Sequence, residues 1–244
     1  MLEALQANGL LQIVLLTLIA GLAMPLGAAL ASVERIHPRW LETEVRHSVI
    51  AFGGGALLAA VALVLVPEGT ENLAIWAIVA CFSAGGVAFM MLDRWLAANG
   101  TQASQLVAML SDFVPEALAL GATFSVSSEG GMLLAGIIAL QNIPEGFNSY
   151  RELAESTHYG RLKIIGTLAL MALLGPVAGA LGYFLLSDMP QLVSGIMLFA
   201  AGGILYIIFQ DIAPQVHLKR HWAPPLGALA GFMLGVVGEV ALSG

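Results

Sequence analysis

The chain has 244 residues, of which 59% are hydrophobic and 10% are charged, with a mean hydropathy of +0.89 and a formal net charge of −7. Soluble domains carry about 25% charged residues, so this composition cannot cover a water-soluble surface and leaves no room for a separate soluble domain. It indicates a membrane bundle of α-helices, because a membrane barrel would show alternating strands of about ten residues, which this sequence lacks.

Apolar runs and turn residues divide the chain into eight predicted transmembrane helices. A helix rises about 1.5 Å per residue, so about 20 apolar residues cross the hydrocarbon core of a bilayer. The predicted spans are residues 9–32, 48–67, 73–96, 104–126, 130–150, 162–186, 191–213 and 224–243. We therefore expect an all-α fold, a polytopic membrane helix bundle in which residues 1–244 form a single transmembrane domain.

The nine Lys and Arg residues indicate the orientation of the bundle. With eight spans, all of them fall at one end: Arg35, Arg39, Arg46, Arg94, Arg151, Arg161, Lys163, Lys219 and Arg220. The loops at the opposite end carry acidic residues and no basic one. Because basic loops stay in the cytoplasm, this pattern predicts a multi-pass protein of the cell (plasma or inner) membrane with both termini outside.

Polar residues interrupt the fourth and fifth predicted spans, which carry Ser111-Asp112-Phe113-Val114-Pro115-Glu116 and Gln141-Asn142-Ile143-Pro144-Glu145-Gly146. In each segment the outer polar residues are four positions apart and share one helix face. Two such faces turned toward each other would bring together two or three carboxylates and an amide oxygen, a set of ligands suited to a divalent cation. An ionisable group at membrane depth costs at least ~2.5–3.5 kcal/mol, so these residues indicate a pathway or a partner.

Prolines occur inside the fourth and fifth predicted spans and at the ends of the second and seventh. Pro115 and Pro144 each remove a backbone N–H, which frees a carbonyl at a depth where only protein or a water-filled cavity can accommodate it. Spans two and seven end in the related patterns Val66-Pro67-Glu68 and Gln210-Asp211-Ile212-Ala213-Pro214, and aligning them places Phe52 over Phe199 and Pro67 over Pro214. Since these two spans run in opposite directions, the match favours a 3+2+3 arrangement with an inverted repeat.

These motifs resemble the ZIP (Zrt/Irt-like) family of divalent metal transporters, and the resemblance covers most of the chain. Its most specific part is the segment 141–146, which nearly matches the HNxPEG-like motif of that family, followed by Pro115 and Glu116. The resemblance implies a single transporter domain of eight transmembrane helices with a pathway between spans four and five. It also implies transport of zinc, or of iron, manganese or cadmium, into the cytoplasm, and it suggests a homodimer.

Carried over position by position, the resemblance implies a principal metal site of Asp112, Glu116, Gln141 and Glu145. Asn142 would belong to a second site, and Asp211 stands near the cytoplasmic exit. The sequence departs from the family where a span-four His-Asn pair becomes Asp112-Phe113 and a span-six Glu-Pro becomes Gly175-Pro176. We therefore expect one transport site and no resident cofactor. Losing an imidazole should weaken the preference for zinc over manganese, iron or cadmium.

Two alternatives stay open. Carboxylates in the spans would also serve a proton-coupled transporter of another solute, although an anionic solute would call for basic residues inside the spans, and here Arg94 and Lys163 lie only at span ends. The chain could also be a transport-inactive membrane scaffold. The sequence has no HExxH motif and no serine nucleophile box, so we do not expect an enzyme. The expected partners are a divalent metal ion and the lipid bilayer, and no nucleic acid.

Overall fold

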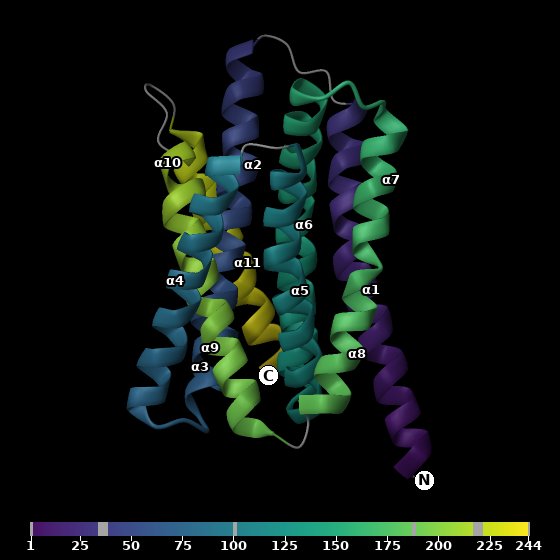
Figure 1. Ribbon diagram of the computed structural model, residues 1–244, viewed down its shortest axis with the longest axis vertical. Helices are drawn as coiled ribbons and strands as arrows, with labels where there is room; N and C mark the ends of the chain where they lie inside the picture. Colours follow the sequence, from purple (N-terminus) through teal and green to yellow (C-terminus); the bar gives the residue numbers. More distant parts are fainter. Residues whose placement is uncertain (1, 34–38, 100–101, 187–188, 217–221, 244) are drawn as a thin grey trace.

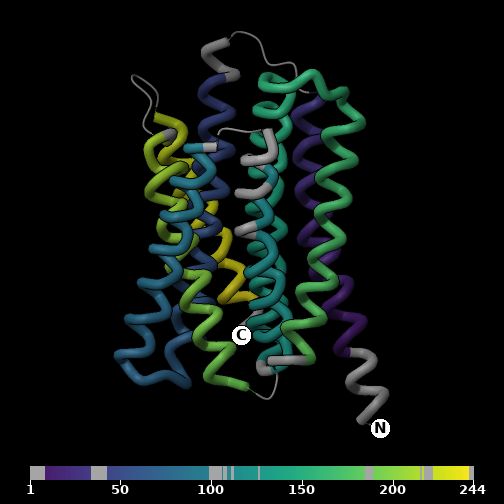
Figure 2. The backbone as a smooth tube through the Cα atoms, in the orientation of Figure 1, coloured from purple at the N-terminus to yellow at the C-terminus, as the bar shows by residue number. Residues whose placement is uncertain are grey.

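The computed structural model describes residues 2–33, 39–99, 102–186, 189–216 and 222–243. The described residues form helices joined by short turns, and they include no β-strand. The predicted all-α fold is thus confirmed. The helices are long and run up and down a single bundle, with successive segments in alternating directions (Figures 1 and 2).

The helices, in chain order, are α1 (Leu2–Val33), α2 (Arg39–Ala60), η1 (Val61–Leu65), α3 (Val66–Thr70), α4 (Ile75–Asn99), α5 (Gln102–Val126), α6 (Ser128–Ser156), α7 (Arg161–Ala172), α8 (Leu174–Leu186), α9 (Pro190–Ile207), η2 (Ile208–Ile212), α10 (Ala213–Val216) and α11 (Ala223–Ser243). The elements η1 and η2 are π-helical turns inside otherwise α-helical rods. The chain therefore continues without a break from α2 to α3 and from α9 to α10.

Six helices within the described residues are long and apolar enough to cross a membrane, which identifies a multi-pass membrane protein. They are Gly9–Val33, Thr43–Thr70, Ile75–Ala98, Arg161–Phe184, Pro190–Ile212 and Ala223–Ala241. The predicted spans 104–126 and 130–150 coincide with α5 and α6. Of these two, α5 contributes a shorter apolar stretch, Phe113–Ser125, and α6 is interrupted by the polar residues of its motif.

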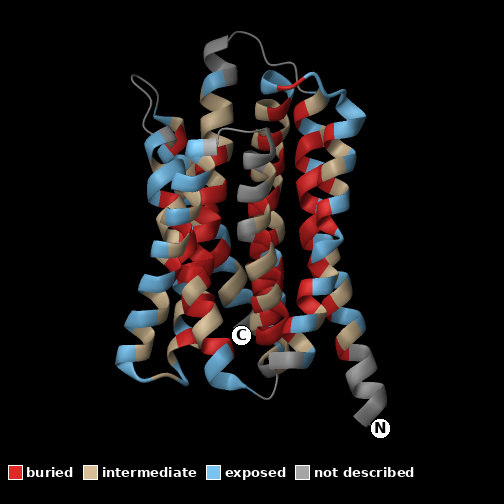
Figure 3. Ribbon diagram, in the orientation of Figure 1, coloured by how far each residue is buried: buried red, intermediate tan, exposed pale blue. Residues whose placement is uncertain are grey.

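The helices form two groups, and the first group includes the central helices α5 and α6 (Figure 1). The first group is α1, α5, α6, α7 and α8, and the second group is α2 to α4 with η1, together with α9 to α11 and η2. The two groups meet mainly where α6 packs on α2, and also where α5 packs on α9. Buried residues concentrate along this centre, whereas the outer helices expose large apolar side chains such as Leu170 and Val240 (Figure 3). Such exposed faces are suited to contact with lipid.

Glycines let α6 lie directly against α1. A Cβ atom at Gly27 of α1 would collide with the carbonyl oxygen of Ile143, and one at Gly146 of α6 would collide with the carbonyl oxygen of Met24. Close backbone approach through small residues is the usual way for membrane helices to gain contact, because lipid offers no hydrophobic drive for their association. The contact fixes the depth of the polar motif of α6, since Ile143 and Gly146 belong to it.

The same reciprocal arrangement of glycines recurs in three other helix pairs. In each pair, one glycine on each helix faces a backbone carbonyl of the other helix. The pairs are α5 with α8 (Gly121 against Gly179, Gly182 against Leu118), α2 with α11 (Gly55 against Ala228, Gly231 against Phe52) and α4 with α9 (Gly85 against Phe199, Gly202 against Phe82). A larger side chain at any of these glycines would force two helix backbones apart.

The two π-helical turns occupy corresponding places in their rods. Each is five residues long, and each is followed two residues later by a proline, Pro67 after η1 and Pro214 after η2. The alignment that places Phe52 over Phe199 also places Val61–Leu65 over Ile208–Ile212. A π-helical turn inserts an extra residue into an α-helix and is frequently found at functional sites.

Candidate functional site

The polar motif of α6 lies at the centre of the bundle, where α6 packs against α1, α2 and α5. The helix continues through Pro144, which removes one backbone N–H and leaves the carbonyl four residues earlier without its usual donor. Gln141 and Asn142, on the turn before this proline, are both fully buried, at 0% exposure. The packing against α1 therefore holds two amide side chains in the interior of the bundle.

Gln141 bonds directly to the acidic residue of α5. Its Nε2 atom donates a hydrogen bond to Glu116 Oε1 at 2.6 Å, and the Glu116 side chain is only 3% exposed. This bond satisfies one oxygen of the carboxylate and one end of the amide. Within the described residues, Glu116 Oε2 and Gln141 Oε1 are buried and accept no hydrogen bond.

Asn142 adds a third buried oxygen of this kind. Its Nδ2 atom donates to the carbonyl of Ala20 on α1 at 2.8 Å, while its Oδ1 atom is buried and accepts no hydrogen bond within the described residues. Leaving such an acceptor unpaired costs about 1–3 kcal/mol. We refer to Glu116, Gln141 and Asn142 as the buried oxygen cluster. Its unpaired oxygens are chemically suited to a cation or to water, and these residues carry no positive charge of their own.

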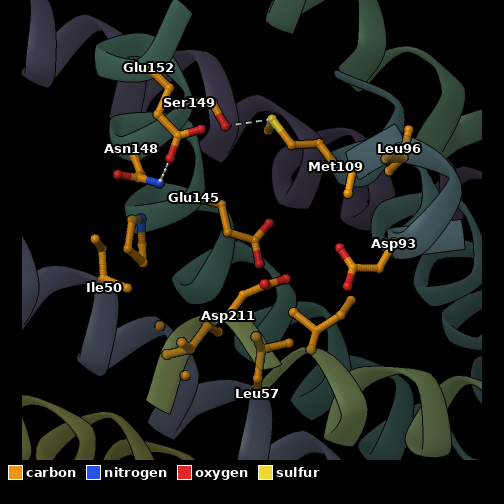
Figure 4. Close-up of a pocket in the computed structure, with 16 residues that line it drawn as sticks. Ile50, Leu57, Asp93, Leu96, Met109, Glu145, Asn148, Ser149, Glu152 and Asp211 are labelled. Atoms are coloured by element: carbon orange, nitrogen blue, oxygen red, sulfur yellow. Dashed lines mark hydrogen bonds between the residues drawn. The ribbon is translucent and has the colours of Figure 1, made fainter. Parts of the chain in front are cut away.

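A partly open cavity of about 410 Å³ is lined by Pro144 and Glu145, which follow Gln141 and Asn142 on α6 (Figure 4). It is found at the end of the bundle where α4 and α6 end and α2 begins, which is the end that carries the Lys and Arg residues that the structure describes. The polar residues that line it are Asp93 of α4, Glu145, Asn148, Ser149 and Glu152 of α6, and Asp211 of η2. Among the described residues, its lining includes four carboxylates and no Lys, Arg or His, so we refer to it as the acidic cavity.

Three of these carboxylates converge from different elements. Figure 4 shows Glu145, Asp93 and Asp211 pointing into the cavity from α6, α4 and η2. Asp93 accepts a hydrogen bond at Oδ2 from the hydroxyl of Tyr206, at 2.9 Å. Glu145 also lies near enough to Glu116 for the two carboxylates to repel each other when both are charged, so the acidic cavity adjoins the buried oxygen cluster.

The fourth carboxylate, Glu152, accepts a hydrogen bond from another residue of α6. Asn148 Nδ2 donates to Glu152 Oε1 at 2.8 Å, one turn further along α6. Gln141, Glu145, Asn148 and Glu152 are spaced four, three and four residues apart, so they form one polar stripe along α6. This stripe runs from the buried oxygen cluster along the wall of the acidic cavity.

The structure brings together five of the six residues predicted from the sequence, in two places. Glu116, Gln141 and Asn142 form the buried oxygen cluster, whereas Glu145 and Asp211 line the acidic cavity. The side chain of Asp112 lies outside the described part of the chain. Within the described residues, no three His, Cys, Asp or Glu side chains come close enough to hold a metal ion together.

Sequence reasoning missed Asp93, Asn148 and Glu152. The last two could have been found, because they continue the spacing of Gln141 and Glu145 on the same face of the helix. Asp93 gave a weaker signal, since a carboxylate in the last turns of a span, next to Arg94, is also what a solvated helix end looks like. Only the packing of α4 on α9, which continues into η2, shows that Asp93 and Asp211 line one cavity.

No family model matches this chain, and a search of curated proteins found no match.

Proposed function

We propose that this protein transports divalent metal cations across a membrane, with zinc as the principal substrate and iron, manganese or cadmium as others. The observation that carries the proposal is the polar stripe of α6, which joins buried, unpaired oxygens to a cavity whose described lining has four carboxylates and no basic residue. Carboxylate and amide oxygens bind divalent cations. A lining of this charge attracts cations and repels anions.

The proposed pathway passes between α5 and α6. A cation would shed water at Glu116 and Gln141, whose oxygens are already dehydrated, and would regain water in the acidic cavity beside Glu145. Because no three described carboxylates surround one point, a cation in the cavity would keep part of its hydration shell. Loose, partly hydrated binding allows release, which a transport pathway requires.

The resemblance to the ZIP family supports the finer architecture that we propose, with eight transmembrane helices, α5 and α6 included, and an inverted repeat in a 3+2+3 arrangement. Two observations support the repeat independently. The π-helical turns η1 and η2 correspond under one alignment, and the glycine contacts of α2 with α11 correspond to those of α9 with α4. An inverted repeat places a substrate site near its interface, which here is the position of α5 and α6.

Uptake into liposomes containing the purified protein tests the function. We expect radioactive zinc to accumulate with the wild type and not with Glu145→Gln, which keeps the shape of the side chain and removes its charge. Glu155→Gln is the matched control, because Glu155 is an exposed carboxylate on the same helix. Wild-type accumulation by Glu145→Gln would contradict the assigned pathway, and no accumulation by the wild type would contradict the function.

Orientation needs a separate test, because it rests on the distribution of Lys and Arg. In a Cys81→Ser background, Glu129→Cys should react with an impermeant thiol reagent added to intact cells. Ser156→Cys, at the other end of α6, should react only after permeabilisation. Both positions are exposed on the protein, so burial cannot explain a difference between them. The reverse pattern would place the acidic cavity on the outside.

A further inference from the structure

Arg46 of α2 makes a hydrogen bond across the contact between the two helix groups. Its Nη2 and Nε atoms donate to Asn148 Oδ1 of α6, at 3.0 Å and 3.3 Å. Both donors come from one planar guanidinium, so the acceptor oxygen is held by two atoms of a rigid group. Arg46 and Asn148 are both half-buried, which shields the bond from water.

Five other long-range side-chain hydrogen bonds among the described residues stay within one group. Gln141 with Glu116, Asn142 with Ala20 and Ser149 with Met109 join helices of the first group. Tyr206 with Asp93, and Asn72 with Ser194, join parts of the second group. The bond between Arg46 and Asn148 therefore differs from these in linking α6, which carries the polar stripe, to a helix of the other group.

The same bond determines which atoms Asn148 offers to the acidic cavity. Asn148 lines this cavity, but its oxygen accepts from Arg46 and its nitrogen donates to Glu152. An amide has one oxygen and one NH₂ group, so the carbonyl that could bind a cation is directed to the guanidinium. One oxygen of Glu152 is likewise occupied by the amide.

We infer that Arg46 is a positioning residue that joins the two helix groups at the acidic cavity and keeps Asn148 from serving as a cation ligand there. The joining role stands on the geometry alone, whereas the effect on cation binding rests on the proposed function. With Arg46 in place the carboxylates of Glu145, Asp93 and Asp211 attract a cation into the cavity, where it keeps part of its hydration shell. Without it, Asn148 gains a free oxygen, the cavity loses a neighbouring positive charge, and α2 can separate from α6.

Distances between spin labels test the joining role without any metal. In a Cys81→Ser background, we would label Ala98→Cys on α4 of the second group and Leu162→Cys on α7 of the first group, both exposed at the same end. The control pair, Ala98→Cys with Leu226→Cys on α11, lies within the second group. We expect Arg46→Ala to broaden the first distance distribution and to leave the control distribution unchanged.

A double-substitution comparison separates the hydrogen bond from the charge of Arg46. If the bond is what matters, Asn148→Ala should broaden the distribution as much as Arg46→Ala does, and the two changes together should do no more than either alone. Arg46→Lys should also broaden it, because a lysine keeps the charge and loses the planar pair of donors. An unchanged distribution in Arg46→Ala, or additive effects of the two changes, would overturn the joining role.

Manganese binding tests the second role. Titration of Mn²⁺ should show binding about 3- to 10-fold tighter in Arg46→Ala than in the wild type, and no such gain when Asn148→Ala is added, because the freed amide oxygen is then absent. Unchanged or weaker binding in Arg46→Ala would overturn this role. If the wild type moves no metal but the label distances respond as expected, the proposed function fails and the joining role stands.

Discussion

The buried oxygen cluster and the acidic cavity use similar chemical groups in opposite surroundings. Glu116, Gln141 and Asn142 are at most 3% exposed and depend on one another or on a backbone carbonyl for their hydrogen bonds. In the cavity, Glu145 is half-buried and Asp211 is exposed, and the carboxylates come from α4, α6 and η2. The cluster is thus a fixed arrangement inside one group of helices, whereas the cavity lies between the two groups.

This difference assigns different roles to the two regions. In the dry cluster an oxygen that lacks a partner is costly, so a bound cation gains much and the geometry must be accurate. In the wet cavity water can replace any one ligand, so each carboxylate contributes mainly negative charge. Substitutions should therefore be severe in the cluster and at Glu145, which adjoins it, and graded elsewhere in the cavity.

The largest expected effect is the loss of zinc uptake in Glu116→Ala, to the level of empty liposomes. This change removes the one carboxylate of the cluster, and the buried amide oxygens that remain carry no negative charge to replace it. By contrast, Glu152→Ala in the cavity should retain measurable uptake, reduced about 3- to 10-fold, because three carboxylates remain and water replaces the fourth. Comparable losses in the two variants would break the distinction between cluster and cavity.

An effect of intermediate size is expected from Gln141→Leu, which should lower the stability of the protein as well as its transport. Gln141→Leu leaves Glu116 Oε1 without its donor in a fully buried site, so the free energy of unfolding should fall by about 1–3 kcal/mol. Denaturation of the purified protein in detergent would measure this. Asp211→Asn is the comparison, and its cost should stay within about 0.5 kcal/mol because the side chain is exposed. A destabilisation as large in Asp211→Asn as in Gln141→Leu would contradict the description of the cavity as wet.

The smallest effect is expected from Tyr206→Phe, which removes the hydrogen bond to Asp93 and keeps the ring. A hydrogen bond of this kind contributes about 1 kcal/mol net, so the apparent affinity for zinc should change by no more than about fivefold. Tyr159→Phe, at an exposed tyrosine of the turn between α6 and α7, should change nothing. Loss of uptake in Tyr206→Phe would show that the position of Asp93 is as strictly required as that of Glu116.

Part of the site could be predicted because it belongs to single helices. Spacing alone places Gln141 and Glu145 on one face of α6, and the aligned motifs draw attention to Glu116 on α5. The hydrogen bond between Glu116 and Gln141 agrees with the prediction that these two faces meet. The structure places Glu116 and Gln141 in the buried interior and Glu145 on the wall of the cavity, and the predicted metal site stays a prediction. The eight spans, the orientation and the transported ion stay predictions.

The amino-acid sequence by itself determined the helical fold and its setting, because apolar residues in such excess can be satisfied only in a membrane, where a helix meets the hydrogen-bonding needs of its own backbone. Local spacing likewise determined which residues share a helix face. Tertiary structure decided which faces meet: that Asp93 and Asp211 share a cavity with Glu145, and that Arg46 reaches Asn148. These contacts depend on the depth and rotation of each helix, which close glycine packing sets through backbone atoms of distant segments. Hydropathy carries no information about that register, since a helix is equally apolar at any depth against its neighbour.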